Sequence, residues 1–572
     1  MTDDQPVRGA DDTLSFDLTS RRWLPVQLLD GQELELSLRE VFARAAQIRR
    51  LAGDIPTQDF ALIRLLLAIL HDALDGPQDV EAWAELWEDD DPFATVAHYL
   101  DAHRERFDLL DEAAPFFQTA DLHTPKGEIF SLNRMVADVP NGEPFFTMRA
   151  LGAERLSLAE AARWVVHAQA YDTSGIKTGV VGDGRAVAGK AYPQGVAWAG
   201  GLGGVLAEGM TLRQTLLLNL IAADSGLLAS DGEDRPAWRR APAVPGAAAD
   251  LDQRPCGVRD LYTWQSRRLL LHADTGGVHG VVLTYGDPLA PQNMQRFEPM
   301  SAWRRSQPQE KKLGRPLVYM PREHDPSRAA WRGLAALIAP RDQDTAARGE
   351  PPSALRPGIV GWLAQLVNER VLPKGTLVRV RTYGAVYGTQ QSVIDEIMED
   401  GLMMAIAVLS DSNRRLGQVA VEAVADAEAA VTVLGYLAAD LAQAAGSDPD
   451  SPKTTARDRG FGALDGLYRT WLAAIRDGDD PQQLRAAWQK TAHREIAAIG
   501  AALVAAAGEA AWQGRVITHA KGQWWLNAAS ADLRFRARLK EGLPLAYGPV
   551  SEPHSADTEG ATRPDCTKVG PV

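Results

Sequence analysis

The stretch GRAVAGKA, Gly184 to Ala191, comes close to the phosphate-binding loop G-x-x-x-x-G-K-S/T. In that loop the backbone N–H groups and the lysine hold phosphates, and the Ser or Thr hydroxyl binds Mg²⁺. The motif also needs a buried strand before it and a helix that opens directly from it. Here Ala191 replaces the hydroxyl residue and Pro193 stops any helix. The sequence therefore disfavours a nucleotide-hydrolysing loop at this point.

Glycine is concentrated around this stretch, with ten glycines in the thirty residues from Gly175 to Gly204. Glycine has no Cβ, so it accepts positive φ and lets the main chain approach a ligand, at an entropic cost that mere filler would not justify. Phosphate or nucleic acid is the ligand that such a backbone suits. We interpret the region as a glycine-rich loop beside a binding surface, and a solvated linker between two packed halves is the alternative.

Other patterns that carry chemistry are weak. The sequence holds no H-E-x-x-H, no G-x-S-x-G and no cysteine pair spaced for a metal. His71-Asp72 is a lone pair inside an apolar stretch, which favours a core histidine over half of a metal site. No two carboxylates have a spacing that assigns an acid and a base. We therefore expect a recognition protein rather than an enzyme, with no catalytic residues, no metal and no cofactor.

Composition indicates the broad class. With 572 residues, 45% of them hydrophobic, the chain is long enough for two or more domains with real cores. The longest apolar stretch, Ala61 to Leu70, contains Arg64 and is far shorter than a membrane span. The beginning of the chain is acidic and polar, so we expect no secretory signal. The two cysteines, Cys256 and Cys566, cannot form a disulfide framework, and we expect a cytoplasmic protein.

The charge balance limits how this chain could bind nucleic acid. A net charge of −15 argues against a protein that coats nucleic acid on its own, because such proteins neutralise phosphates with many Lys and Arg. Binding would have to be local or shared with partners. Two basic clusters are candidates: residues 304–316 hold five cations, and Arg379 and Arg381 share one face of a strand-like segment. Each such cluster is more often a solvated face.

The elements that would position these residues begin with a hairpin. Asp30-Gly31 between alternating apolar residues is a tight-turn signal. Ser37 and Glu40 have the spacing of a capping box, which predicts a helix that runs through Arg50.

The middle of the chain changes character several times. A strongly apolar helix is predicted from Gln58 to Leu74. From Pro115 to Gly209, short aromatic runs are broken by Pro and Gly, and residues 227–257 are a Pro/Ala/Asp-rich surface excursion. The segments Leu261–Ala273 and Gly277–Gly286 alternate like paired strands.

Beyond about Ser410, apolar residues recur at helical spacing in four long segments. Short polar turns such as DGDDP separate them. Four helices with short connections predict an antiparallel bundle. The last residues have almost nothing to bury and are typical of a disordered tail.

Several segments resemble, in their order, one known family. They are FDLTSRRWLPV, APFFQT, the glycine-rich stretch running into GMTLRQTLLLNL, LYTWQSRRLLL and YGAVYGTQQSV. Over residues 14–545 the chain resembles the CasA family, the large subunit of the type I-E CRISPR surveillance complex, Cascade.

The resemblance implies a function. CasA proteins recognise the protospacer-adjacent motif (PAM) in duplex target DNA and start its unwinding, while pairing with guide RNA reads the remaining sequence, a division of labour similar to that of other RNA-guided proteins. The implied partners are target double-stranded DNA, guide RNA, the other Cascade subunits (backbone, handle-binding and small subunits) and a helicase-nuclease recruited after target binding, in antiviral defence, with no membrane. The alternative is a nucleotide-binding or phosphate-handling enzyme built on the glycine-rich region.

The resemblance also implies a mixed α/β fold, with a large irregular α+β N-terminal domain followed by a C-terminal four-helix bundle. Together with the patterns above, it predicts four parts. They are a disordered leader over residues 1–15, a PAM-recognition domain over 16–405, the bundle over 406–545 and a disordered tail over 546–572. In the family the bundle contacts the small subunits and the DNA path.

The family reads the PAM with three features, a glycine loop, a glutamine wedge and a basic finger. By resemblance these fall on Gly175, Ile176, Lys177, Thr178 and Gly179, on Gln390 and Gln391, and on Arg296. Glycines would let backbone approach the minor groove, where base edges are only weakly coded, and Lys177 could also pair with phosphate. A planar amide could slip against a base pair while the strands part. The alternative for the two glutamines is a simple polar hairpin tip.

The stretch VPNGEPFFTMR corresponds to the family loop that reaches toward the guide-RNA handle and holds the subunit in the complex. Its implied contact residues are Asn141, Phe145, Phe146, Met148 and Arg149. The two phenylalanines could stack on bases or on a neighbouring subunit, or they could cover a core as lid residues. Some family members carry a cysteine-rich insert before the basic finger. This sequence lacks it, so no zinc is expected.

Overall fold

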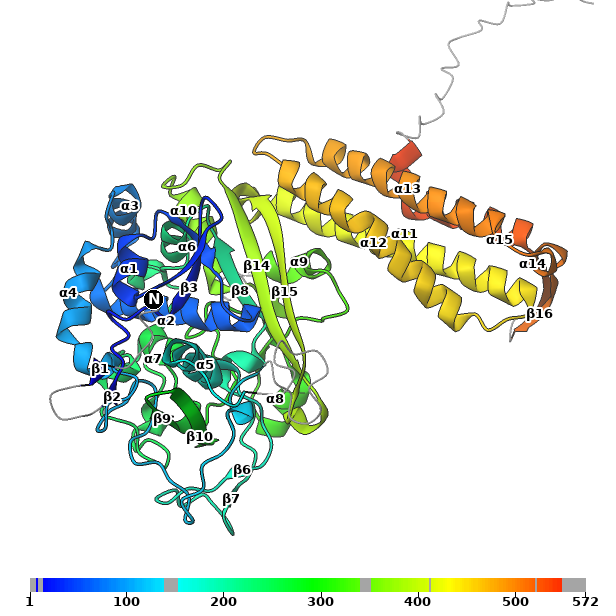
Figure 1. The fold of residues 1–572 in the computed structure, drawn as a ribbon. Coiled ribbons are helices and arrows are strands. Elements are labelled where there is room, and N and C mark those ends of the chain that lie inside the picture. The colour runs from blue at the N-terminus through cyan, green and yellow to red at the C-terminus, as the bar shows by residue number, and fades with distance from the viewer. Residues whose placement is uncertain are drawn as a thin grey trace, which may run out of the picture. The chain divides into compact units, whose positions relative to one another are not determined.

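The computed structural model, shown in Figure 1, describes residues 7–8, 14–137, 153–339, 351–410, 413–519 and 522–547. By its internal contacts the chain forms two compact units. The first unit is Met1–Val424 with Asp465–Pro481, and the second is Ala425–Leu464 with Gln482–Val572. The domain limits predicted from the sequence stay predictions. Within the described part, no helix is long and apolar enough to cross a membrane.

A small antiparallel sheet of three strands lies near the start of the first unit. Its strands, in the order β4, β3, β5, are Glu33–Leu36, Leu24–Leu28 and Ile48–Leu51. The predicted turn between β3 and β4 is confirmed, and Gly31 has a φ of +89° there, a value that a residue with a Cβ rarely adopts.

The capping box is confirmed, but the helix it starts is shorter than predicted. The side chain of Ser37 accepts a hydrogen bond from the Glu40 backbone, and the Glu40 side chain accepts one from the Ser37 backbone. Helix α1 spans only Leu38–Ala43, so the predicted continuation through Arg50 is wrong. The chain turns and forms β5, because pairing with β3 buries Ile48 at the start of that strand.

Helix α2, Pro56–Ala73, is the centre of the first unit and matches the predicted apolar helix. It packs against α5 (Leu158–Tyr171) and α7 (Val258–Tyr262). His71 in α2 is fully within the core, and burial lowers its pKa to about 3, which keeps the ring neutral. This confirms the interpretation of His71 as a core histidine.

The remaining elements of the first unit are short. Its other helices are α3 (Val80–Glu88), α4 (Ala94–Ala102), α6 (Leu212–Leu218), α8 (Gln307–Leu313), α9 (Leu334–Leu337) and α10 (Gly358–Asn368). Its short strands are β1 (Val7–Arg8), β2 (Leu14–Ser15), β6 (Lys177–Thr178), β7 (Lys190–Ala191), β11 (Trp303–Arg305), β12 (Tyr319–Pro321) and β13 (Ala354–Leu355).

The predicted strand pair is present as β9 (Arg267–Asp274) and β10 (Gly277–Tyr285), which run antiparallel. The start of the first predicted segment is wrong. Leu261 lies in helix α7, and the strand begins only at Arg267. The apolar residues that suggested a strand there are buried by packing of α7 on α2 instead.

A long hairpin of β14 (Leu377–Tyr387) and β15 (Ile394–Ala405) forms the ribbon that crosses Figure 1 beside the first unit's helices. The pair extends from Leu377 opposite Ala405 to Tyr387 opposite Ile394. Strand β8 (Gly204–Glu208) completes the sheet in the order β15, β14, β8. The hairpin carries its turn, the 3-10 helix η9 (Thr389–Gln391), to one end of the sheet.

Four helices form the helical bundle: α11 (Arg414–Ala445), α12 (Asp450–Ala474), α13 (Pro481–Ala505) and α15 (Ala528–Gly542). Most of their residues belong to the second unit, whereas the first residues of α11 and the last residues of α12 are counted with the first unit. Between α13 and α15 lie α14 (Glu509–Gln513) and the hairpin of β16 (Arg515–His519) and β17 (Gly522–Leu526).

Contacts within this unit tie the helices together. Arg485 of α13 forms an ion pair with Asp426 of α11 at 2.9 Å. A Cβ on Gly460 of α12 would lie 3.0 Å from Val431 of α11, so these helices approach closely. The predicted four-helix bundle and the mixed α/β class of the chain are both confirmed, as the helices and sheets in Figure 1 show.

Candidate nucleic-acid interface

The two predicted PAM-reading loops meet in the structure, although more than two hundred residues separate them in the sequence. The backbone N–H of Ser174 donates to the carbonyl of Gln391 at 2.8 Å. A Cβ built on Gly175 would lie 3.3 Å from the Cβ of Ser392, so the glycine backbone packs directly on the hairpin turn. The glycine loop and the glutamine tip therefore form one surface of the first unit, which we call the loop pair (residues 174–179 and 389–392).

The glycine loop has a defined backbone. Gly175 has a φ of +105°, which favours glycine, and its carbonyl accepts a hydrogen bond from the Tyr285 hydroxyl at 2.5 Å. Lys177 and Thr178 form β6, which pairs with β7. The side chain of Ile176 is 60% exposed, so the loop presents an apolar residue to solvent at its tip.

Gly179 is constrained from inside the loop. A Cβ there would lie 2.9 Å from both the Cβ of Ala186 and the carbonyl carbon of Gly189. Its N–H donates to the Gly189 carbonyl at 2.9 Å. We expected glycine here to let DNA approach the backbone, but the space beside Gly179 is filled by its own hairpin. The structure therefore explains this glycine by packing.

Lys177 forms a buried ion pair beneath the loop. Its ammonium lies 2.6 Å from a carboxylate oxygen of Asp172, and its side chain is only 10% exposed. The guanidinium of Arg267 binds the same carboxylate. Burial tends to raise the pKa of Asp172, but the charges of Lys177 and Arg267 outweigh burial and hold that pKa below its ordinary value. In this conformation Lys177 supports the loop from below and does not offer its charge to a phosphate at the surface.

An exposed cation that the sequence did not single out lies beside the loop. Arg134 donates from its guanidinium to the Thr178 hydroxyl at 2.9 Å. Its guanidinium carbon also lies 3.6 Å from the ring centre of Phe130, a cation–π contact that orients the side chain. Arg134 ends the short 3-10 helix η2 (Leu132–Arg134), and no charge pattern surrounds it in the sequence, so no sequence signal pointed to it.

The glutamine tip is a tight turn at the end of the β14–β15 hairpin. Gln390 and Gln391 have φ values of +57° and +55°, which are uncommon for residues other than glycine and tend to occur at functional sites. Neither side-chain amide forms a hydrogen bond with another residue in the described part of the chain. The hydroxyl of Tyr387 donates to the Tyr171 carbonyl at 2.7 Å and fixes the hairpin just before the turn.

A cavity of about 240 Å³ lies against this turn and brings in another cation. Gln391, Arg267 and Arg304 all contribute to its lining. Arg304 is exposed and belongs to β11, at the start of the basic cluster of residues 304–316. One end of that cluster therefore lines the same cavity as Gln391.

Arg296, the predicted basic finger, has an exposed side chain. Its backbone carbonyl accepts a hydrogen bond from the backbone N–H of Ala229. Among the described residues, no hydrogen bond or ion pair joins Arg296 to the loop pair.

The other basic candidates face carboxylates. Arg381 pairs with Glu399 on the neighbouring strand, and Arg379 lies 3.7 Å from Glu208. Arg49 also pairs with Glu208, at 3.0 Å. These charges are partly neutralised within the sheet. The predicted handle-loop residues 141–149 lie outside the described residues.

The glycine-lysine stretch does not form a phosphate loop. Residues 184–191 make the turn of the β6–β7 hairpin and end in β7, and Lys190 pairs through its backbone with Thr178. In the described structure the next element after β7 is the 3-10 helix η3 (Trp198–Gly201), so no helix opens directly from this turn. Throughout the described ranges, no group of three or more His, Cys, Asp or Glu side chains is placed to bind a metal.

Comparison with known proteins identifies the family. The model of the family described as CRISPR-associated protein Cse1 matches residues 17–499. The chain belongs to the Cse1 family. A curated Cse1-family relative, CRISPR-associated protein CasA/Cse1 of Thermus thermophilus, is 27% identical over 418 residues, which cover 71% of this chain and 77% of the relative.

Solved Cse1 structures share the fold over nearly the whole chain. Thermobifida fusca Cse1 is 59% identical, with a TM-score of 0.86, and the match covers 93% of this chain and 98% of that one. Cse1 from Acidimicrobium ferrooxidans is 29% identical, with a TM-score of 0.78 and the same coverage. A chain of a CRISPR RNA-guided surveillance complex has the same fold at 20% identity, with a TM-score of 0.66, and the match covers 92% of this chain and 99% of that one.

Proposed function

We propose that this Cse1-family chain is the large, non-catalytic subunit of a CRISPR RNA-guided surveillance complex, Cascade of type I-E, and that its loop pair recognises the PAM in duplex DNA and starts strand separation. The observation that carries the proposal is the contact between the glycine loop and the glutamine tip, through the Ser174–Gln391 hydrogen bond. A protein that recognises the PAM and also separates the strands must do both at one point on the DNA. The contact between the two loops would bring both functions to one point.

The glycine loop would face the minor groove. Gly175 has no side chain, and exposed Ile176 beside it offers an apolar edge of modest size. Minor-groove base edges carry little sequence information, so a close-fitting backbone discriminates by excluding wrong edges as much as by hydrogen bonding. The ion pair of Lys177 with Asp172 holds the loop in the shape that this fit requires.

The glutamine tip would act as the wedge. Gln390 and Gln391 are free of side-chain hydrogen bonds to other described residues, so their amides are available to bases. Tyr387 holds the strand before the turn, and a wedge must be held firmly if insertion is to separate base pairs. Arg134 and Arg304 add exposed positive charge near the tip, where they would contact phosphates.

The rest of the chain would hold the subunit in the complex. The bundle would contact the small subunits and the path of the DNA. The loop with Phe145 and Phe146 would reach the guide-RNA handle, and the assembled subunit would help to recruit the helicase-nuclease. Family membership and the shared fold of a surveillance-complex chain support this part of the proposal.

The proposal is tested with the complex reconstituted around Gln390→Ala/Gln391→Ala. Because both side chains are at an exposed tip, we expect normal assembly and folding but slow opening of PAM-bearing duplex. DNA opened beforehand as a bubble should restore normal binding. Gln32→Ala, which removes an exposed glutamine from the turn region of the β3–β4 hairpin, is the control and should behave as the wild type. Failure of the bubble to rescue the double variant would show that the tip is not a wedge.

A further inference from the structure

Tyr285 lies beneath the glycine loop without belonging to the loop pair. It is the last residue of β10, and its side chain is fully buried. Its hydroxyl donates to the carbonyl of Gly175 at 2.5 Å. Burial raises the pKa of this hydroxyl, so the phenol keeps the proton that it donates. A buried donor from a strand thus holds one carbonyl of the glycine loop.

The ring of Tyr285 has a separate role, in the charged cluster under the loop. The ammonium of Lys177 lies 5.6 Å from the ring centre, and the guanidinium carbon of Arg267 lies 4.9 Å from it. Both cations also bind Asp172. An aromatic ring attracts cations near its face through its quadrupole. Tyr285→Phe would keep this ring in place and remove only the hydroxyl.

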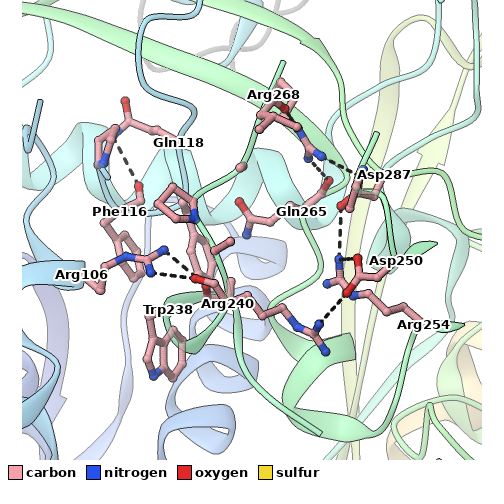
Figure 2. Close-up of a pocket in the computed structure, with 18 of the residues that line it drawn as sticks. Arg106, Phe116, Gln118, Trp238, Arg240, Asp250, Arg254, Gln265, Arg268 and Asp287 are labelled. Atoms are coloured by element: carbon pink, nitrogen blue, oxygen red, sulfur yellow. Dashed lines mark hydrogen bonds and ion pairs between the residues drawn. The ribbon is translucent and has the colours of Figure 1, made fainter. Parts of the chain in front are cut away.

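The backbone at Tyr285 is fixed from two sides. Arg185, in the turn of the β6–β7 hairpin, donates to the carbonyls of Tyr285 at 3.1 Å and Gly286 at 2.7 Å. Asp287 forms an ion pair with Arg268 of β9 at 2.6 Å, which Figure 2 shows in the wall of an adjoining cavity. The hydroxyl that holds the glycine loop is therefore itself held in place.

The hydrogen bond to Gly175 sets the orientation of one peptide group. The bond between Gly175 and Ile176 is trans, so the carbonyl of Gly175 and the N–H of Ile176 point in opposite directions. Because Tyr285 holds the carbonyl from the buried side, the N–H is directed away from that side. No hydrogen bond to another described residue uses this N–H, and the Ile176 side chain is 60% exposed. The loop therefore offers a backbone donor at its tip, and every base pair presents acceptors in the minor groove.

We propose that Tyr285 is a positioning residue for PAM recognition, a role that rests on the proposed function of the loop pair. Its hydroxyl holds the Gly175 carbonyl inward and thereby presents the Ile176 N–H to an acceptor in the minor groove. Without the hydroxyl this peptide group can rotate, because glycine accepts many backbone conformations. The donor would then have the binding orientation for only part of the time, and the affinity for the PAM would fall by that fraction.

The test measures the affinity of the reconstituted complex, with the wild-type chain or Tyr285→Phe, for three DNAs that match the guide. They are a duplex with a PAM, a duplex without one, and PAM-bearing DNA in which the target is opened as a bubble. Tyr285→Phe should weaken binding of both PAM-bearing DNAs about twofold to twelvefold, the net value of one hydrogen bond, and leave binding of the PAM-free duplex unchanged.

Tyr468→Phe is the matched control. The Tyr468 side chain is equally buried, and its hydroxyl likewise donates to a backbone carbonyl, that of Ala420 at 2.7 Å, outside the loop pair. This variant loses the same kind of hydrogen bond and should bind all three DNAs as the wild type does. Thermal unfolding of each isolated variant shows that any loss of binding does not come from misfolding.

The outcomes separate the positioning role from the proposed function. A wild-type complex that binds the duplexes with and without a PAM equally well would refute PAM recognition itself. Normal PAM discrimination by both the wild type and Tyr285→Phe would overturn only the positioning role. That role also fails if Tyr285→Phe weakens binding of the PAM-free duplex to the same extent, or if the bubble restores its affinity. In those cases the hydroxyl would act in general binding or in strand opening.

Discussion

Replacing Gly175 by alanine should disturb the loop pair in a way that the structure lets us estimate. At a φ of +105° an alanine is strained, and such backbone outliers cost about 1–3 kcal/mol each. The new Cβ would also lie 3.3 Å from the Cβ of Ser392, tighter than ordinary van der Waals contact. Separation of the glycine loop from the glutamine tip would relieve this strain. If DNA binding requires the two loops to come together again at the full cost of about 1–3 kcal/mol, the affinity for PAM-bearing DNA falls about fivefold to 150-fold.

The matched control is Gly184→Ala in the same hairpin. A Cβ on Gly184 meets no atom within 4 Å, and the backbone there is not in the positive-φ range, so the variant should fold and bind as the wild type. Adding Ser392→Gly to Gly175→Ala removes the contact but not the backbone strain, and should restore binding only in part. The assay is the affinity of the assembled complex for duplexes with and without a PAM. Equal PAM discrimination by Gly175→Ala and Gly184→Ala would refute the reasoning.

Three further predictions concern stability and assembly. Asp172→Asn leaves the cation of Lys177 buried without its partner and should lower the free energy of unfolding by about 3–5 kcal/mol, measured by denaturant titration; an unchanged midpoint contradicts the buried cluster. Burial raises the pKa of Asp59 to about 6, so the protonated carboxyl stabilises the folded chain fully below about pH 4. This contribution to the free energy of unfolding, about 3 kcal/mol, is lost as the pH rises through about 6. Unfolding of Asp59→Asn should lack this pH-dependent loss, and parallel pH profiles for variant and wild type would rule it out. Phe145→Ala/Phe146→Ala should loosen the subunit from the complex by about 1–3 kcal/mol for each ring and leave the melting temperature of the isolated chain unchanged; normal co-purification with a lowered melting temperature would assign the rings to a core.

The sequence alone determined the features whose causes lie within a few residues. The turn at Gly31 follows from a positive-φ requirement, and the start of α1 follows from reciprocal hydrogen bonds between Ser37 and Glu40. The core position of His71 follows from its apolar neighbours along α2. The bundle was predictable for the same reason, because helical periodicity and short turns act locally.

The ends of several elements depend on contacts with residues that are distant in the sequence. Helix α1 ends at Ala43 because the following residues pair with β3, and no residue inside the helix signals that stop. Leu261 lies in α7 rather than in a strand because packing of α7 against α2 buries its side chain. Local propensity is a weak prior, and tertiary packing decides between elements that are both locally allowed.

The candidate site was predictable only as separate pieces. Residue type and family resemblance pointed to Gly175 and Gln391, but only the fold shows that their loops touch, since the β14–β15 hairpin carries the tip to the glycine loop. Likewise, only the fold shows that Lys177 forms an ion pair with the buried carboxylate of Asp172 and that Arg134 donates to the Thr178 hydroxyl. Ion pairs and hydrogen bonds between residues this far apart in the sequence depend on how the whole chain packs. A local sequence pattern contains no information about that packing.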